Sequence, residues 1–316
     1  NAFGLGSESQ AGGRTGSTAI SLDAIQEIQV NVAPFDVRQS GFVGSGLNAV
    51  TRSGTNRFQG SAFYNYRNND LQGARAGDIR VASTQFEEII MGLRLGGPII
   101  KDKLFFFVSA ETVEKTEPAT SYVANGSSNP GTTTRVEKAD LDNLSLFLKE
   151  KYNYVTGPYE NFNNATTSEK FLARLDYNLN LKNKLSLRYI HHDSQSDQLI
   201  SDSRSLGAGD RRTRIDAMAY QNSGYAIQDN TRSIVGEWNS SLTNSLFNKL
   251  VVGYDYQNED RKTNVDVFPT VDILKDNKTY ISFGYDPFTP SNNLNYNTLH
   301  LTNDLSYSRG KHNFTF

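Results

Sequence analysis

The sequence predicts an all-β protein in which antiparallel strands form the wall of a transmembrane barrel. Two observations predict this fold: apolar and polar residues alternate as in strands, and short connections alternate strictly with long ones. The alternation has period two in nine stretches, at residues 57–67, 86–97, 102–113, 168–179, 183–195, 229–242, 246–259, 293–308 and 311–316. Each stretch is therefore expected to have one apolar and one polar face.

The two faces can be read most clearly in the stretch FLARLDYNL. Phe171, Leu175 and Leu179 share one face, whereas Arg174 and Asp176 share the other. In a membrane barrel the apolar face points to lipid and the polar face to the lumen. We expect a lipid-facing set of Phe106, Val108, Leu175, Leu187, Leu250, Val252, Leu299 and Leu301. We expect a lumen-facing set of Arg94, Glu111, Arg174, Arg188, Glu237 and Asp304.

The connections between these stretches alternate in length along the whole chain. The short ones are GGPIIKDK, LNLKNK, LTNSLFN and SRGKH, and the long ones cover residues 68–85, 114–167, 196–228 and 260–292. Loops beyond about 12–15 residues are uncommon in compact soluble domains. Outer-membrane barrels, in contrast, combine short periplasmic turns with long external loops. The alternation favours a membrane barrel, and a soluble β-sandwich or adhesin module is the alternative.

Composition excludes several other classes of protein. The net charge of -2 and the pI of about 6.1 provide no basic footprint for nucleic acid. The absence of cysteine excludes disulfides, thiolate metal sites and a cysteine nucleophile. The mean hydropathy of -0.54 is compatible with a barrel, because only every second strand residue meets lipid.

Residues 1–55 differ in character from the nine stretches. They open with a Gly/Ser-rich run, continue with LDAIQEIQVNV and contain Gly41, Gly44, Gly46 and Gly54. Glycines at these positions suit tight turns and close backbone packing. They do not form the G-x-G-x-x-G pattern of a dinucleotide-binding loop. We therefore predict a compact unit at 1–55, followed by a barrel wall at 56–316.

The segment LDAIQEIQVNVAPFDVRQSGFVGSGLNAVTRSGTNRFQGSAFYNYRN resembles the end of the plug and the first barrel strand of TonB-dependent outer-membrane transporters. Its residue pattern is similar to that of the Oar-like branch, and so are the patterns of LGGPIIKDKLFFFVSAE and KFLARLDYNLNLKNKLSLRY. The resemblance implies that 1–55 is the C-terminal part of a plug domain. It implies that 56–316 supplies about nine strands of a plugged 22-strand barrel, so we expect both ends of the full protein to lie outside this sequence.

The resemblance also implies a function and partners. It implies active transport of a bulky ligand across the bacterial outer membrane. A peptide or a protein is one option for that ligand. The partners are then the TonB complex, reached through a region absent here, and outer-membrane lipid. An outer-membrane adhesin or secretion-associated barrel that binds a partner through its loops is the alternative.

We find no motif for catalysis, a cofactor or a metal. No G-x-S-x-G or H-E-x-x-H pattern occurs, so we expect no enzyme activity. His191 and His192 are neighbours on one strand, and their side chains should point to opposite faces. The stretch ADLDNLSLFLKEKY predicts a helix within the longest loop, with Asp140 capping its start and Leu141, Leu144, Leu148 and Tyr152 on one face.

Two arginines and two glutamates are candidates for fastening the plug to the wall. Arg38 and Arg52 lie in the predicted plug, and Glu111 and Glu237 face the lumen by strand parity. Buried charges are normally paired. We therefore expect Arg38 or Arg52 to bind Glu111 or Glu237.

Overall fold

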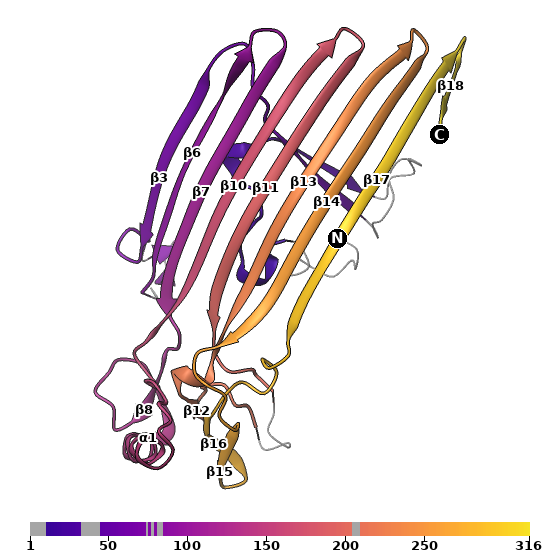
Figure 1. The fold of residues 1–316 in the computed structure, drawn as a ribbon. Coiled ribbons are helices and arrows are strands. Elements are labelled where there is room, and N and C mark those ends of the chain that lie inside the picture. Colours follow the sequence, from indigo (N-terminus) through magenta and orange to yellow (C-terminus); the bar gives the residue numbers. More distant parts are fainter. Residues whose placement is uncertain (1–10, 33–44, 74, 77–78, 81–84, 204–208) are drawn as a thin grey trace.

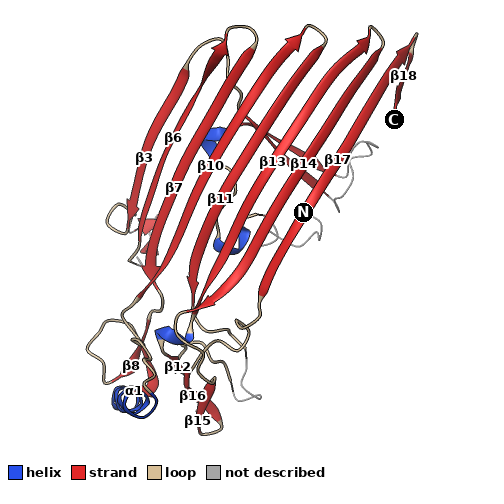
Figure 2. Cartoon of the chain, in the orientation of Figure 1, coloured by secondary structure: helices blue, strands red, loops and turns tan. Residues whose placement is uncertain are grey.

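A computed structural model of the chain describes residues 11–32, 45–73, 75–76, 79–80, 85–203 and 209–316. Its largest element is a nine-stranded antiparallel sheet whose neighbouring strands follow one another along the chain (Figures 1 and 2). The strands are β3 (Gln59–Asn68), β6 (Glu87–Ile100), β7 (Leu104–Pro118), β10 (Asn163–Asn180), β11 (Asn183–Gln198), β13 (Tyr225–Thr243), β14 (Leu246–Thr263), β17 (Asn293–Arg309) and β18 (His312–Thr315). The sheet is open, with β3 and β18 at its edges.

All nine predicted strands are confirmed, but several extend further into the predicted loops. β7 continues to Pro118, β10 begins at Asn163 and β13 begins at Tyr225. The extensions pair in register, for example Thr167 opposite Glu114. In β7 and β10, backbone hydrogen bonds form in these extensions although both faces are polar, so the apolar alternation ends before the strand does.

The two faces of the sheet carry the residues that the sequence predicts. Arg94, Glu111 and Arg174 contact the N-terminal segment, by which we mean residues 11–32 and 45–55. The other predicted lumen residues share this face through cross-strand register: Arg188 lies opposite Arg174, Glu237 opposite Ser186 and Asp304 opposite Lys249. On the opposite face, predicted lipid-facing residues are exposed, among them Leu175, Leu187, Val252, Leu299 and Leu301.

The N-terminal segment lies behind the sheet in the view of Figure 1. It contains two short 3-10 helices, η2 (Gly13–Thr15) and η3 (Leu22–Ala24), and a hairpin-like pair formed by β1 (Ile25–Val32) and β2 (Ser45–Thr51). Gly54 then packs so closely on β6 and β7 that a Cβ would overlap the carbonyl oxygen of Phe106. Only glycine fits this approach, which agrees with the close packing expected there.

The long loops do not lie separately on the surface. Three of them fold together into one unit, which we call the cap, at the lower end in Figure 1. Its elements are β8 (Tyr122–Asn125), β9 (Thr132–Glu137), α1 (Lys138–Tyr152), β12 (Met218–Ala219), η4 (Gln221–Ser223), β15 (Val271–Lys275) and β16 (Lys278–Phe283). The fourth long loop contains the short β4 (Arg75–Ala76) and β5 (Ile79–Arg80). β12 and β16 pair in parallel although they come from different loops.

The cap has its own hydrophobic core. Its buried members are Ala124, Val136, Leu141, Leu148, Tyr154, Met218, Tyr220, Tyr280, Ile281 and Phe283. The predicted helix is confirmed as α1, and Leu141 and Leu148 face this core. Tyr152, which was expected on the same face, is exposed at the helix end, where its ring packs edge-on against Phe147 and Phe268. The described residues contain no helix long and apolar enough to cross a membrane.

Polar contacts complete the cap. The Arg135 guanidinium donates to the carbonyl oxygens of Asp216, at 2.8 Å, and of Thr279, at 3.1 Å, so it joins the three loops. Asp140 accepts a hydrogen bond from the Tyr280 hydroxyl, and Glu137 takes the N-cap position that we expected for Asp140. Burial, and then the carboxylate of Asp142, raise the pKa of Tyr159 to about 12.

The exposed position of Leu187 provides a test of the lipid-facing surface. Leu187→Arg near the bilayer midplane is expected to lower the stability of the membrane-inserted state by about 2–4 kcal/mol. Leu274→Arg is the matched control, because Leu274 is similarly exposed (49% against 46% for Leu187) but belongs to the cap. Equilibrium unfolding in lipid vesicles measures both. Equal effects of the two substitutions would contradict a lipid contact at Leu187.

Candidate functional site at the inner face of the sheet

The N-terminal segment crosses the inner face of the sheet and is fastened to strands far apart in the sequence. Near its start, the Arg14 guanidinium lies 2.8 Å from Glu259 of β14. The Thr15 hydroxyl lies 2.7 Å from the Ser194 hydroxyl of β11. The segment therefore binds the wall over much of its width.

A buried ion pair lies at the centre of this interface. Glu111 of β7 and Lys170 of β10 are directly opposite in register, and their charged atoms are 2.6 Å apart. Their side chains are only 9% and 8% exposed. The Ser21 hydroxyl donates a hydrogen bond to Glu111 at 2.5 Å, so the N-terminal segment supplies a second hydrogen-bond donor to this carboxylate. Desolvation makes such a pair stable only while its partners are all present.

A second ion pair joins the segment to the first wall strands. The Asp23 carboxylate lies 3.1 Å from the Arg94 guanidinium of β6 and accepts a hydrogen bond from Ser61 of β3 at 2.7 Å. Ser21 caps η3 through the Asp23 amide, which fixes the direction of this turn. Arg174 of β10 donates to the carbonyl oxygen of Thr51 at 2.9 Å and so holds the end of β2.

The predicted pairing of Arg52 with a glutamate of the wall is wrong. Glu111 lies at the interface as expected, but its cationic partner is Lys170 of the wall rather than Arg52. The Arg52 guanidinium donates instead to the carbonyl oxygen of Asp23 at 3.0 Å. The physical reason is register: Lys170 already stands directly opposite Glu111, so this carboxylate needs no arginine from the segment.

The remaining predicted residues divide into two groups. Glu237 lies toward the turn end of the sheet, where Lys249 is its ion-pair partner at 3.3 Å and Asn239 donates to it at 2.6 Å. Gly46 lies within β2, opposite Asn31. The prediction also includes Arg38, Gly41 and Gly44, which lie outside the described residues.

Sequence reasoning missed Arg14, Ser21, Asp23 and Glu259 at this interface. The residues around them match no binding motif. They meet at the interface only because of the path that the segment takes across the sheet. One signal was available, because the lumen-facing parity of Arg94 required an acidic partner from somewhere in the chain. The identity of that partner could not be read from spacing.

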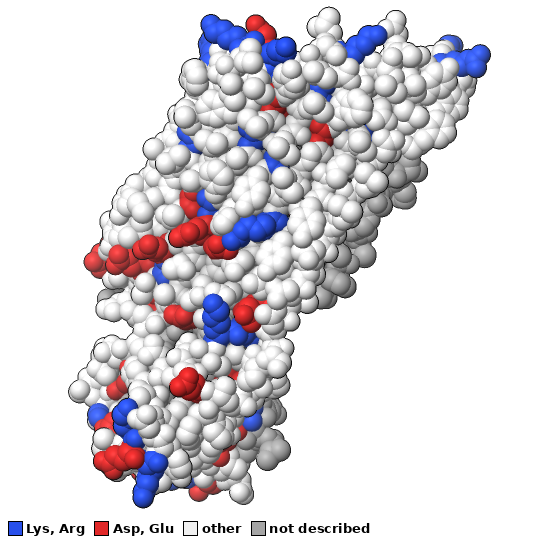
Figure 3. All heavy atoms as spheres, in the orientation of Figure 1, with Lys and Arg blue, Asp and Glu red and all other residues white. Residues whose placement is uncertain are grey.

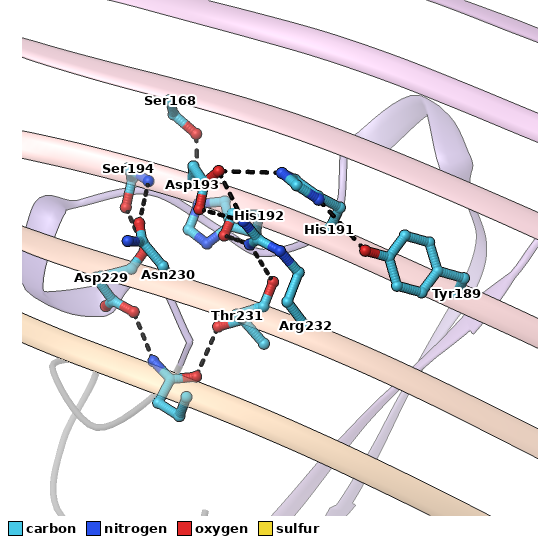
Figure 4. Close-up of polar contacts among 11 residues, drawn as sticks. Ser168, Tyr189, His191, His192, Asp193, Ser194, Asp229, Asn230, Thr231 and Arg232 are labelled. Atoms are coloured by element: carbon cyan, nitrogen blue, oxygen red, sulfur yellow. Dashed lines mark hydrogen bonds and ion pairs between the residues drawn. The ribbon is translucent and has the colours of Figure 1, made fainter. Parts of the chain in front are cut away.

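The two adjacent histidines lie on opposite faces, as strand geometry predicts (Figure 4). His192 is fully buried on the inner face, where its Nε2 lies 3.2 Å from the Ser17 hydroxyl and 3.3 Å from that of Ser168. His191 lies on the outer face beside Asp193, which also accepts two hydrogen bonds of 2.8 Å from Arg232. Within the described ranges, no group of three or more His, Asp or Glu residues is arranged to hold a metal ion.

A cavity of about 1160 Å³ opens between the N-terminal segment and strands β3, β6, β7, β10 and β11, toward their cap end. Its charged side chains are mostly paired: Arg67 binds Glu88 at 2.8 Å, and Lys115 binds Glu117 at 2.7 Å. Ser17, Ser168 and Thr166 add hydroxyl groups to the lining. The cavity can therefore hold a polar ligand through hydrogen bonds without a large excess of either charge.

Comparison with known proteins decides the family. Residues 50–316 match the family described as "Outer membrane beta barrel domain". The chain belongs to this family. An outer-membrane β-barrel domain of this kind accounts for the exposed apolar face of the sheet, and it places the protein in the outer membrane. The predicted fold class and location are thereby confirmed.

Two named proteins resemble this outer-membrane β-barrel domain. TonB-dependent transporter Oar from Myxococcus xanthus is 34% identical over 97 residues, which cover 29% of this chain and 9% of Oar. The crystal structure of the outer membrane transporter YddB from Escherichia coli has a TM-score of 0.58 at 10% identity. The match covers 92% of this chain and 34% of YddB, and it shows a shared fold. The chain thus spans a minor part of each relative.

Proposed function

We propose that this barrel domain belongs to a TonB-dependent transporter that moves a bulky ligand across the outer membrane. Residues 1–55 then form the C-terminal part of a plug, and residues 56–316 form wall strands with external loops. The observation that carries the proposal is the N-terminal segment fastened across the inner face and leading directly into β3. The partial identity to a protein named as a TonB-dependent transporter supports it.

The proposed orientation follows from the connections. Short turns face the periplasm and long loops face outside in outer-membrane barrels, so the cap lies outside the cell. A ligand would enter beneath the cap and bind in the cavity lined by the N-terminal segment and β3, β6 and β7. The TonB complex would then pull on the plug from the periplasm, through a region that precedes the described residues.

The chemistry of the interface suits a plug that can be released. Its contacts are mainly hydroxyl hydrogen bonds and ion pairs, and its apolar core is small: Ala24, Phe107, Leu172 and Ile190. Exchanging one such hydrogen bond for a bond to water costs only about 0.5–1.5 kcal/mol. A polar interface of this kind can be hydrated stepwise during transport.

A disulfide lock tests the proposal. In the full-length protein, Thr15→Cys with Ser194→Cys places thiols where two hydroxyls are 2.7 Å apart, and this chain contains no other cysteine. Oxidation is expected to abolish TonB-dependent ligand uptake, and a reductant is expected to restore it. Thr166→Cys with Ser196→Cys is the matched control, because these hydroxyls are 2.8 Å apart within the wall. Uptake that persists in the oxidised Thr15–Ser194 variant would contradict the proposal.

The cap favours one alternative, an adhesin or secretion-associated barrel that binds its partner without transport. The supporting observation is the separate hydrophobic core of the cap. For such a protein, the locked plug would leave partner binding intact, and deletion of the TonB complex would have no effect. The same lock therefore discriminates between the two functions.

A further inference from the structure

The outer face of the sheet has an apolar belt with a charged edge at each end. The belt contains exposed residues such as Leu93, Leu175, Leu187, Val252 and Leu301. Figure 3 shows this face, with Lys and Arg gathered at the turn end and a row of Asp and Glu toward the cap. The row consists of Glu87, Glu114, Glu169 and Asp193, which share outward parity on four neighbouring strands, and Arg232 of the next strand neutralises Asp193 at the end of the row.

The turn end of the belt carries the basic edge. Three of the four tight turns contribute cations, and we call Lys101, Lys103, Lys182, Arg309 and Lys311 the basic rim. All five residues are exposed, whereas Lys184 is left out because it shares the inner face with Ser186 and Asn239. Among the described residues, no carboxylate forms a salt bridge with them, and Asp102 is held by Asn56 instead. The Lys103 ammonium lies 5.9 Å over the ring of Tyr177, which is on the lipid-facing side.

The separation of the two edges fits a bilayer. β7 runs from just after Lys103 to beyond Glu114. With a rise of roughly 3.4 Å per residue and a tilt of about 40°, these two charges lie about 28 Å apart along the membrane normal. This distance matches the apolar band of outer-membrane barrels, so the rim lies at the depth of lipid headgroups.

We propose that the basic rim binds the phosphate groups of anionic phospholipids in the leaflet on the turn side. Apolar side chains stand beside the cations: Ile99, Ile100 and Leu181 are all exposed, and Leu181 is fully so. A ligand that satisfies both features has an acyl chain next to a phosphate, which a soluble anion lacks. The acidic row at the other end disfavours the same headgroups there, so the two edges together orient the wall in the membrane.

Lipid retention by the purified full-length protein tests this proposal. Native mass spectrometry compares bound phosphatidylglycerol with phosphatidylcholine of the same acyl chains. We expect a preference for phosphatidylglycerol that falls about fivefold for each rim lysine changed to Gln, at Lys101, Lys103, Lys182 and Lys311. The matched control changes four exposed cap lysines to Gln, at Lys149, Lys151, Lys275 and Lys278, and should leave the preference unchanged.

Several outcomes would overturn the proposal. These are equal retention of the two lipids, a preference that survives in the rim variant, or an equal loss in the cap variant. Competition with millimolar inorganic phosphate separates the sources of phosphate: displacement of the lipid would show a site for soluble anions instead. The measurement depends on the transmembrane wall but not on transport, so its failure would leave the disulfide-lock experiment unaffected.

Discussion

Glu111→Ala is expected to loosen the N-terminal segment and to raise the leakage of small solutes through the full-length protein. The substitution leaves the Lys170 ammonium buried without its carboxylate and removes the acceptor of Ser21. Removing one partner of a buried ion pair typically costs about 3–5 kcal/mol. Ser21 and Thr18 of the segment contact Glu111 and Lys170, so release of the segment would hydrate the unpaired ammonium and is favoured by the substitution.

Conductance in planar bilayers and hydrogen exchange of residues 14–24 measure this effect. Glu237→Ala is the control, because Glu237 and Lys249 are partly exposed at the turn end and such pairs contribute only about 0–1 kcal/mol. The double variant Glu111→Met with Lys170→Met should recover most of the loss, since it leaves no unpaired charge. Unchanged conductance and exchange in Glu111→Ala would show that this ion pair does not hold the segment.

Leu141→Ala is expected to destabilise the whole cap rather than α1 alone. Leu141 is fully buried, and its carbonyl oxygen accepts a hydrogen bond from Tyr220 of another loop at 2.7 Å. Truncation of a buried leucine to alanine costs about 2–5 kcal/mol, depending on how far the cavity collapses. The core is shared, so the effect should reach residues 271–283 as well.

Limited proteolysis of the membrane-inserted protein measures the state of each loop. We expect faster cleavage in both 119–162 and 264–292 in Leu141→Ala. Leu146→Ala, on the same helix but 62% exposed, should be cleaved at the wild-type rate. Faster cleavage confined to 119–162 would show that the loops fold independently.

The wall was predictable from the sequence because its physical rule is local. Lipid on one face and water on the other impose a period of two, and residues such as Leu175 and Arg174 reveal it directly. The rule does not apply where both faces of a strand contact water, so the sequence did not predict the extensions of β7 and β10 into the loops. The helix α1 was found for the same reason, since Leu141 and Leu148 repeat with helical spacing.

The interface and the cap could not be predicted, because their partners are far apart in the chain. Asp23 meets Arg94, and Arg14 meets Glu259, only when the segment follows one particular path over the sheet. Met218 reaches Ile281 only through a parallel pairing between two loops. No local period or motif encodes such contacts. The sequence did indicate that a buried charge such as that of Arg94 would need a partner, but it did not identify the partner.

The shared core of the cap has a consequence for the order of folding. Its residues extend from Ala124 to Phe283, so it cannot form until β7, β10, β11, β13 and β14 have brought three loops together. Contacts of such long sequence separation form late, because the chain between them must first be ordered. In the proposed orientation, we therefore expect the loops to cross the membrane before the core of the cap has formed. The cap would then fold last, on strands that already hold its three loops together.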